Sequence, residues 1–198
     1  MTDPAREPSR RERNKRAKLD RITAAASALF AEHGVDDVTT QEIAEAADIG
    51  TGTLFLYVRN KGELLLLVQN AHYADALAVG VAEAESATSA LDAVMAILRP
   101  VVACNRVQVD NGRTYLREMV FGDPADPQRA AALEIVARTE RAVAASLTRL
   151  GAGSPAEADV RAHVISAVMF VELSSTDEPD VEILVSRIRE QVRVLVAP

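Results

Sequence analysis

Residues 39–61 carry the sequence TTQEIAEAADIGTGTLFLYVRNK, and this stretch decides the fold. It is typical of two very short helices joined by a tight turn. Thr39 is a helix N-cap residue, and Glu42 stands three positions later, which is the spacing of a capping box. Ile43 and Ala47 then lie on one apolar face. The stretch therefore predicts a first helix of about two turns.

The turn and the second helix follow directly. Asp48 tolerates a left-handed backbone and can end the first helix, so the second helix begins at Gly50 or Thr51. Leu54 and Val58 are four residues apart and face inward. The outer surface of this second helix is then made by Thr51, Gly52, Thr53, Leu56 and Tyr57.

The outer surface suits the major groove of DNA. Hydroxyl groups can bond base edges or phosphates, Leu56 can meet a thymine methyl group, and the phenol of Tyr57 can reach a phosphate. A surface helical hairpin with no nucleic-acid role is the alternative reading of this spacing. The sequence context favours DNA recognition.

A longer run of residues supports that context. Its members are Leu29, Phe30, Gly34, Thr39, Thr40, Ile43, Ala44, Thr53, Leu54, Phe55, Lys61, Leu64 and Leu65. In type and spacing this run resembles the N-terminal domain of the TetR family of bacterial transcriptional repressors. The match covers about the first third of the chain. Asp48 stands where the family usually has glycine, and Leu56 replaces one of two aromatic residues, which affects the operator sequence and not the binding mode.

The resemblance implies a homodimer that binds a palindromic operator in double-stranded DNA and is released by a small, lipophilic molecule. It also implies that Lys61, at a helix start, contacts a phosphate. The predicted DNA-binding residues are Thr39, Thr40, Gln41, Thr51, Gly52, Thr53, Leu56, Tyr57 and Lys61. A constitutive DNA-binding regulator without an effector is the alternative function.

Charge is distributed unevenly along the 198 residues. The net charge is −7, yet residues 1–21 carry eight Lys or Arg against four Asp or Glu. A basic segment can meet phosphates while an acidic body is repelled from them. A solvated, disordered tail is the alternative reading. We expect residues 1–18 to form a basic, partly disordered arm.

Helical periodicity continues to the end of the chain, and no strand pattern appears. An apolar stripe from Leu19 to Phe30 predicts the helix that ends at Gly34, and Asn60 with Glu63 predicts a capping box for the next long helix. Further helices are expected at about 88–109, 112–121, 127–150, 155–173 and 179–196. Nine helices then form an all-α protein with two domains: residues 19–60 bind DNA, and residues 61–198 bind the effector and dimerise.

The middle helices are expected to enclose the effector. Pro100 interrupts a helix and should kink it, which can widen a cavity. The predicted lining residues are Leu98, Val102, Asn105, Tyr115, Met119, Glu140, His163 and Phe170. Glu140 falls in an apolar stripe, where a carboxylate should be paired, protonated or facing a ligand. For each of these residues ordinary packing, or for Glu140 a place at the solvent edge, is the alternative.

The last two helices carry apolar residues on two sides, which indicates two packing partners. We predict a two-fold dimer interface containing Val164, Val168, Val171, Leu184, Ile188 and Val192. A buried helix pair in a monomer is the alternative. We expect a cytoplasmic protein with no membrane partner, because the N-terminus is charged and contains proline.

Catalytic and metal chemistry are not expected. The chain has one cysteine, Cys104, and three widely separated histidines, so it lacks the spacing of a metal site. A nucleophile with an adjacent base and a glycine-rich phosphate loop are also missing from the sequence. The sequence predicts neither an enzyme nor a cofactor. Cys104 is read as a small buried side chain, with redox sensing as the alternative.

Overall fold

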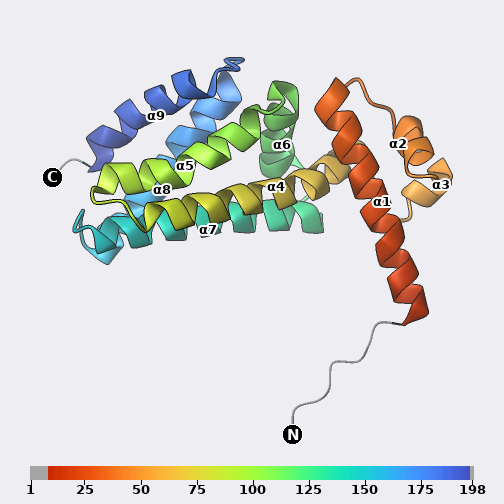
Figure 1. Cartoon of the computed structure of the whole chain (residues 1–198), viewed down its shortest axis with the longest axis horizontal. Coiled ribbons are helices and arrows are strands. Elements are labelled where there is room, and N and C mark those ends of the chain that lie inside the picture. The colour runs from red at the N-terminus through yellow and green to blue at the C-terminus, as the bar shows by residue number, and fades with distance from the viewer. Residues whose placement is uncertain (1–8, 197–198) are drawn as a thin grey trace, which may run out of the picture.

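The computed structural model describes residues 9–196, and within them it contains nine helices and no strand (Figure 1). The helices are α1 Arg10–His33, α2 Thr40–Ala46, α3 Thr51–Leu54, α4 Lys61–Ala84, α5 Ala90–Arg106, α6 Val109–Phe121, α7 Pro127–Arg149, α8 Pro155–Ser175 and α9 Val181–Val196. The all-α prediction with nine helices is confirmed for this part of the chain.

Helix α1 begins earlier than the apolar stripe indicated. Ser9 caps it: the Ser9 hydroxyl accepts a hydrogen bond from the N–H of Glu12 at 3.2 Å, and the Glu12 carboxylate accepts one from the N–H of Ser9 at 2.6 Å. This is a complete capping box, which satisfies two amides that the helix leaves free. Residues 10–18, expected to belong to a partly disordered arm, are therefore helical. Residues 1–8 of that arm lie outside the described residues.

Three helices form the N-terminal domain. Ile22, Ala26 and Phe30 of α1 are buried, and α1 packs on α2 and α4 while α3 packs on α2. Gly34 ends α1 with a positive φ of 81°. In Figure 1 the charged first half of α1 extends away from this core. The domain thus presents α3 and the start of α1 at one end of the molecule.

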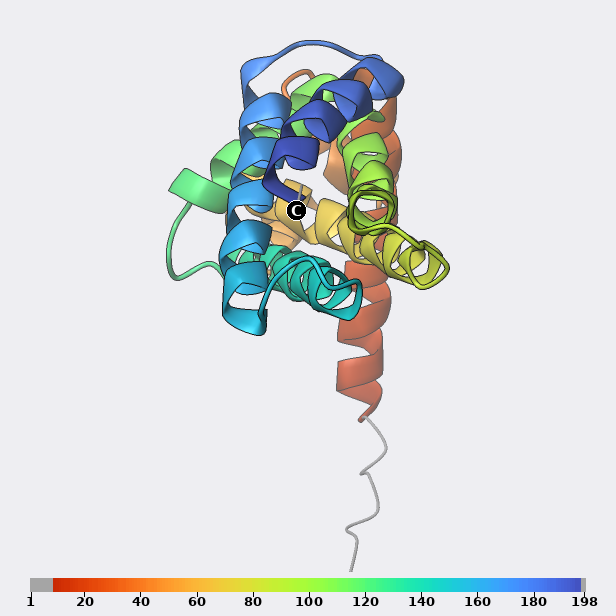
Figure 2. The same cartoon turned by 90° about the vertical axis from the view of Figure 1, so that its left-hand side faces the viewer.

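Helix α4 connects the two domains. It contacts α1 and then runs through the second domain against α5, α6 and α7, while α8 and α9 complete that domain (Figures 1 and 2). Asn60 caps α4 as predicted, but the Glu63 carboxylate accepts hydrogen bonds from the backbone and side chain of Arg59 and not from Asn60. By length and composition α4 could span a membrane; its many buried residues make it the core helix of this bundle.

Candidate nucleic-acid interface and effector cavity

The helix–turn–helix geometry follows from the residues that the sequence singled out. Thr39 accepts from the N–H of Glu42 at 3.2 Å, and Glu42 accepts from the N–H of Thr39 at 2.7 Å, so the predicted capping box is present. Asp48 has a φ of 54°, the left-handed conformation expected at the turn. Ile43, Leu54 and the other inward-facing residues are buried, which holds α2 and α3 at a fixed angle.

Helix α3 is shorter than expected. It ends at Leu54, because the next amides bond three residues back: Leu56 N–H to the Thr53 carbonyl at 3.1 Å and Tyr57 N–H to the Leu54 carbonyl at 2.9 Å. Leu56 and Tyr57 therefore lie in a tighter turn directly after α3. Leu56 is 79% exposed, and Gly52 is exposed as well. Thr51, Thr53 and Tyr57 are half-buried.

The start of α1 lies beside this turn. A surface groove is lined on one side by Thr53, Leu56 and Tyr57 and on the other by the polar face of α1. The α1 residues are Arg10, Arg11, Asn14, Lys15 and Lys18. Four cations are thus fixed next to the proposed base-reading residues, which composition alone could not establish. The sequence did not indicate that these residues are helical, and therefore not which of the basic side chains share one face of the helix.

The remaining DNA-contact candidates have partners within the protein. The Lys61 ammonium donates to the carbonyls of Asp36 at 3.1 Å and Val38 at 3.0 Å, so it ties the α1–α2 loop to the start of α4. Two of the three N–H groups of the ammonium are used in these bonds. A contact between the third and a DNA phosphate stays a prediction. Gln41 donates to Glu45 at 2.9 Å, and the side chain of Thr39 serves its capping box, while Thr40 opens α2.

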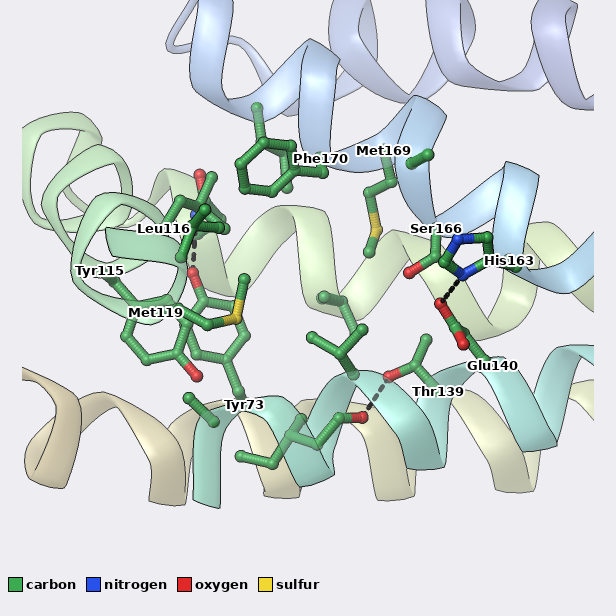
Figure 3. A pocket seen from close by; sticks show the side chains of 18 residues that line it. Tyr73, Tyr115, Leu116, Met119, Thr139, Glu140, His163, Ser166, Met169 and Phe170 are labelled. Carbon is green, nitrogen blue, oxygen red and sulfur yellow. Dashed lines mark hydrogen bonds and ion pairs between the residues drawn. The ribbon is translucent and has the colours of Figure 1, made fainter. Parts of the chain in front are cut away.

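A cavity of about 280 Å³ lies in the second domain between α4, α5, α6, α7 and α8 (Figure 3). Its lining is Tyr73, Val101, Asn105, Tyr115, Leu116, Met119, Val120, Ala132, Ile135, Val136, Thr139, Glu140, His163, Ser166, Ala167, Met169, Phe170 and Leu173. Six of the eight predicted residues are among them. Leu98 and Val102 are not: both are fully enclosed in the core, and α5 turns Val101 and Asn105 toward the cavity instead.

Two stacked tyrosines form the inner end of the cavity. The rings of Tyr73 and Tyr115 have centroids 4.4 Å apart. The Tyr73 phenol accepts from Asn105 at 2.6 Å, and the Tyr115 phenol donates to Asn70 at 2.9 Å. Burial raises the pKa of both phenols, so they are neutral at pH 7. Tyr73 was not predicted as a lining residue, because its position on α4 has the spacing of any core residue.

A buried arginine continues this polar chain. Arg106 donates to the side chain of Asn105 and to the carbonyls of Leu173 and Thr176, the latter two at 3.0 and 3.2 Å. Burial lowers the pKa of the Arg106 guanidinium, since desolvation disfavours the charged form. These bonds attach the end of α8 to α5 beside the cavity.

Helix α6 touches both the cavity and the DNA-binding domain. Its middle supplies Tyr115 and Met119 to the cavity. At its start, the Asn111 side chain donates to the Phe30 carbonyl at 2.7 Å and accepts from the Val35 N–H at 2.6 Å. All of these groups are buried. One rigid helix therefore links the cavity wall to the end of α1.

Gly34 allows this close approach. A Cβ atom at Gly34 would lie 2.6 Å from the side-chain nitrogen of Gln108, and the positive φ is itself unfavourable for other residues. From the sequence, Gly34 was predicted only to end a helix. Its partner Gln108 comes from more than seventy positions away, which local patterns cannot reveal.

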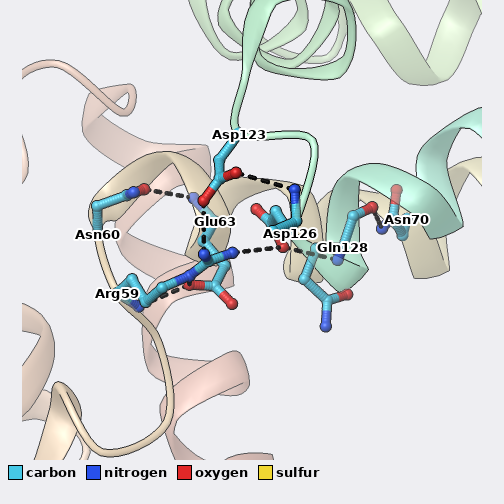
Figure 4. A network of polar contacts seen from close by, with 8 residues as sticks. Arg59, Asn60, Glu63, Asn70, Asp123, Asp126 and Gln128 are labelled. Atoms are coloured by element: carbon cyan, nitrogen blue, oxygen red, sulfur yellow. Dashed lines mark hydrogen bonds and ion pairs between the residues drawn. The ribbon is translucent and has the colours of Figure 1, made fainter.

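A second connection joins the domains through Arg59 (Figure 4). Its guanidinium lies 2.7 Å from a carboxylate oxygen of Asp123 and 3.6 Å from one of Asp126, both at the α6–α7 connection, and 3.3 Å from Glu63. The hydrogen bond to Glu63, followed by the nearby carboxylates, raises the pKa of Arg59. The segment after α3 is thereby attached to the end of α6 as well.

The predicted dimer-interface residues fall into two groups in the structure: those on α8 are accessible, and those on α9 are buried within the chain. On α8, Val164 and Val171 are exposed and Val168 is half-buried, so their place in a dimer interface stays a prediction. Three predicted residues of α9 are fully buried within the single chain, so their assignment to the interface is wrong: Leu184, Ile188 and Val192. The stripe on α9 is the face that packs on α5 and α8. Its exposed apolar residues are Ile183 and Val194.

No group of three or more potential metal-ligating side chains comes together in residues 9–196. The thiol of Cys104 is half-buried, and burial raises its pKa to about 11. A thiol with that pKa is a poor nucleophile at neutral pH.

The geometry defines a helix–turn–helix domain followed by a second, cavity-bearing helical domain. Residues 22–68 match the model of the bacterial regulatory proteins of the tetR family. The resemblance seen in the sequence is confirmed over that stretch, and the fold of the whole chain is that of TetR-family regulators.

Three solved structures illustrate the likeness. A TetR transcriptional regulator from Rhodococcus sp. RHA1 has a TM-score of 0.66 at 22% identity, covering 93% of this chain and 98% of that one. A transcriptional regulator from Cytophaga hutchinsonii has a TM-score of 0.66 at 19% identity, covering 91% and 97%. FadR of Thermus thermophilus, a TetR-family repressor in complex with lauroyl-CoA, has a TM-score of 0.66 at 18% identity, covering 89% and 92%. No curated protein matches the chain.

Proposed function

We propose that this protein is a cytoplasmic, dimeric repressor that binds a palindromic operator and is released when a small lipophilic molecule enters the cavity. The observation that carries the proposal is the double attachment of α6. Tyr115 and Met119 on α6 line the cavity, and Asn111 on the same helix holds the end of α1. A ligand that displaces α6 therefore changes how the DNA-binding domain is held.

The response would be a shift between two conformations of the dimer. A ligand can move that equilibrium only by its difference in affinity for the two states, and bound DNA must weaken ligand binding by the same factor. The two reading helices of a dimer meet successive major grooves when they are about 34–36 Å apart. In this proposal, a ligand that displaces α6 changes that spacing through the bonds of Asn111 to the end of α1.

The size and apolar lining of the cavity support this function over constitutive DNA binding. A constitutive regulator has no use for about 280 Å³ of apolar space, because empty volume in a core is destabilising. The DNA-binding residues we propose are those of the groove between α1 and α3, together with six residues from α2, α3 and the starts of α2 and α4: Thr39, Thr40, Gln41, Thr51, Gly52 and Lys61.

Selection of bound fragments from random-sequence DNA, followed by fluorescence anisotropy on the selected operator, tests the proposal. We expect a two-fold symmetric site bound by a dimer at nanomolar concentrations. Compounds that raise the thermal midpoint of the free protein should weaken operator binding in the same assay. Stabilising compounds that leave operator affinity unchanged would instead favour the constitutive form.

A further inference from the structure

The cavity has two chemically different ends (Figure 3). The inner end is aromatic and apolar: Tyr73 and Tyr115 are almost fully buried there, near Leu116, Met119 and Phe170. The other end carries Thr139, Glu140, His163 and Ser166. His163 is 78% exposed in its side chain and Glu140 is 27% exposed, so this polar end is the mouth.

Charge at the mouth is one-sided. Among residues 9–196, Glu140 is the only carboxylate in the lining, which contains no lysine or arginine from that part of the chain. The lining residue that pairs with Glu140 is His163, whose Nδ1 lies 3.0 Å from a carboxylate oxygen of Glu140. The His163 side chain is 78% exposed, so water competes with Glu140 for its ring nitrogens. Glu140 is thus a partly buried anion with a weak, replaceable partner.

We infer that the effector is a small molecule with an apolar, preferably aromatic body and one protonated amine, and that its ammonium group binds Glu140 in place of His163. This inference rests on the proposed function and specifies its ligand. The apolar body fills the inner end against Tyr73, Tyr115 and Phe170. The ammonium has three donors, for which Glu140 and the hydroxyl oxygens of Thr139 and Ser166 are acceptors at the mouth.

The displacement of His163 costs little, because its imidazole already faces solvent. An ammonium group at Glu140 forms a charge-assisted hydrogen bond with the carboxylate, and such bonds are stronger than those between neutral groups. An anionic ligand meets the opposite situation: its charge would approach Glu140 with no fixed cation among the described lining residues. The phosphate-bearing head of an acyl-CoA therefore lacks a binding partner in this part of the cavity.

Size restricts the ligand further. The volume of about 280 Å³ lies just below the ~300–1,000 Å³ of cavities that take drug-sized molecules. A phenyl ring on a four-carbon chain is a reasonable upper estimate of the body. We therefore choose three probes that share this body: 4-phenylbutylamine, 4-phenylbutan-1-ol and 4-phenylbutyrate.

Calorimetric titration of the dimer at pH 7.5 with the three probes tests the inference. We expect the amine to bind at least tenfold more tightly than the alcohol and the carboxylate to bind most weakly. Glu140→Gln should abolish the preference for the amine and leave the affinity for the alcohol within about twofold. Glu134→Gln is the matched control, because Glu134 is an exposed acid on the same helix, paired with Arg141 outside the cavity.

His163→Ala provides a second variant that leaves the core intact. It removes the competitor for Glu140 and should strengthen amine binding, whereas a histidine that binds the ligand itself would weaken it. Equal or tighter binding of the alcohol or the carboxylate overturns the inference. So does an amine affinity that Glu140→Gln does not change, or failure of the amine to bind at all.

Operator release by the same probes separates this inference from the proposed function. If the alcohol binds best and releases the operator, ligand response stands and the amine assignment fails. If the amine binds through Glu140 but the operator stays bound, the ligand class stands and the proposed ligand response fails.

Discussion

The side-chain amide of Asn111 donates to the main-chain carbonyl of Phe30 at 2.7 Å, across 81 positions of sequence. The same side chain accepts from the N–H of Val35, so one residue of α6 satisfies the backbone on both sides of the α1 terminus. Removal of this buried amide leaves the Val35 N–H without a partner, which is destabilising, whereas the Phe30 carbonyl still accepts from the Gly34 N–H at 3.0 Å.

Asn111→Ala should therefore lower the free energy of unfolding by about 1–3 kcal/mol, the cost of one buried unsatisfied N–H. Urea denaturation followed by circular dichroism measures the change. Asn14→Ala, on the exposed face of α1, should stay within about 0.5 kcal/mol of the parent protein. Similar values for the two variants would mean that water replaces the Asn111 bonds.

Thr53→Ala or Tyr57→Ala should weaken specific operator binding by about 1–3 kcal/mol, since each removes a hydrogen-bonding group from the reading surface. Fluorescence anisotropy on the selected operator gives the affinities, and circular dichroism checks the fold. Arg141→Ala, at the far side of α7, serves as the control. If both substitutions leave affinity intact, α3 does not read the operator.

The cations of α1 should determine the salt dependence of binding. Replacing Arg11, Lys15 and Lys18 together by alanine keeps a good helix former at each position. The slope of log K against log salt should become less negative by ~0.9 for each phosphate that the protein no longer neutralises, up to about 3 per protomer. Titrations between low and physiological salt measure the slope. An unchanged slope would show that this face of α1 is only solvated.

The two faces of the C-terminal helices should respond differently to a new charge. Val164→Glu with Val171→Glu on α8 should give a folded monomer that no longer binds the operator at nanomolar concentrations, because four carboxylates would be buried in a two-fold interface. Sedimentation velocity and anisotropy measure both effects. A double variant that stays dimeric would place the interface elsewhere.

Ile188→Glu on α9 should unfold the protein, unlike the α8 double variant. Ile188 is fully buried inside one chain, so a carboxylate there should unfold the protein and not merely separate the dimer. Thermal unfolding distinguishes the outcomes: the α8 variant keeps a cooperative transition, and the Ile188 variant loses it. A folded, monomeric Ile188→Glu protein would return this side chain to the dimer interface.

Cys104 should react slowly with iodoacetamide in the native protein. Because burial raises its pKa to about 11, only ~0.1% of the thiol is ionised at pH 8, and the thiolate is the reactive form. The rate should rise with pH up to about that pKa and should increase when the protein is unfolded in urea. Fast native labelling at pH 8 would revive a redox role.

Local signals predicted most of the fold. The breaks at Gly, Pro and clustered polar residues placed the ends of α4 to α9 within a few positions, and the box of Thr39 and Glu42 defined the start of α2. The start of α1 was missed because its apolar stripe begins at Leu19, although Ser9 and Glu12 have the spacing of a capping box. Apolar periodicity reveals only those parts of a helix that pack on a core. The first half of α1 is exposed, so it has no apolar stripe by which it could be recognised.

The sites were less predictable, because they depend on contacts between distant elements. Six cavity residues were identified from apolar and polar positions near a helix break, but Tyr73 and Ser166 enter it through the packing of α4 and α8. Which stripe of α9 faces inward was also undecided by the sequence: both sides are apolar, and only the packing on α5 selects Leu184 and Ile188. The contacts that Asn111 and Arg59 make between the two domains join residues far apart in the sequence, so no local pattern predicts them.

The preformed helix at residues 10–18 changes the thermodynamics of meeting DNA. A flexible arm loses about 1–2 kcal/mol of backbone entropy for each residue that DNA orders, and this loss opposes binding. Here the capping box of Ser9 orders those residues in the free protein, so in the proposed complex their cations would meet the phosphates from a fixed row. Association can then depend on electrostatic attraction and displaced counterions, with little folding left to complete on the operator.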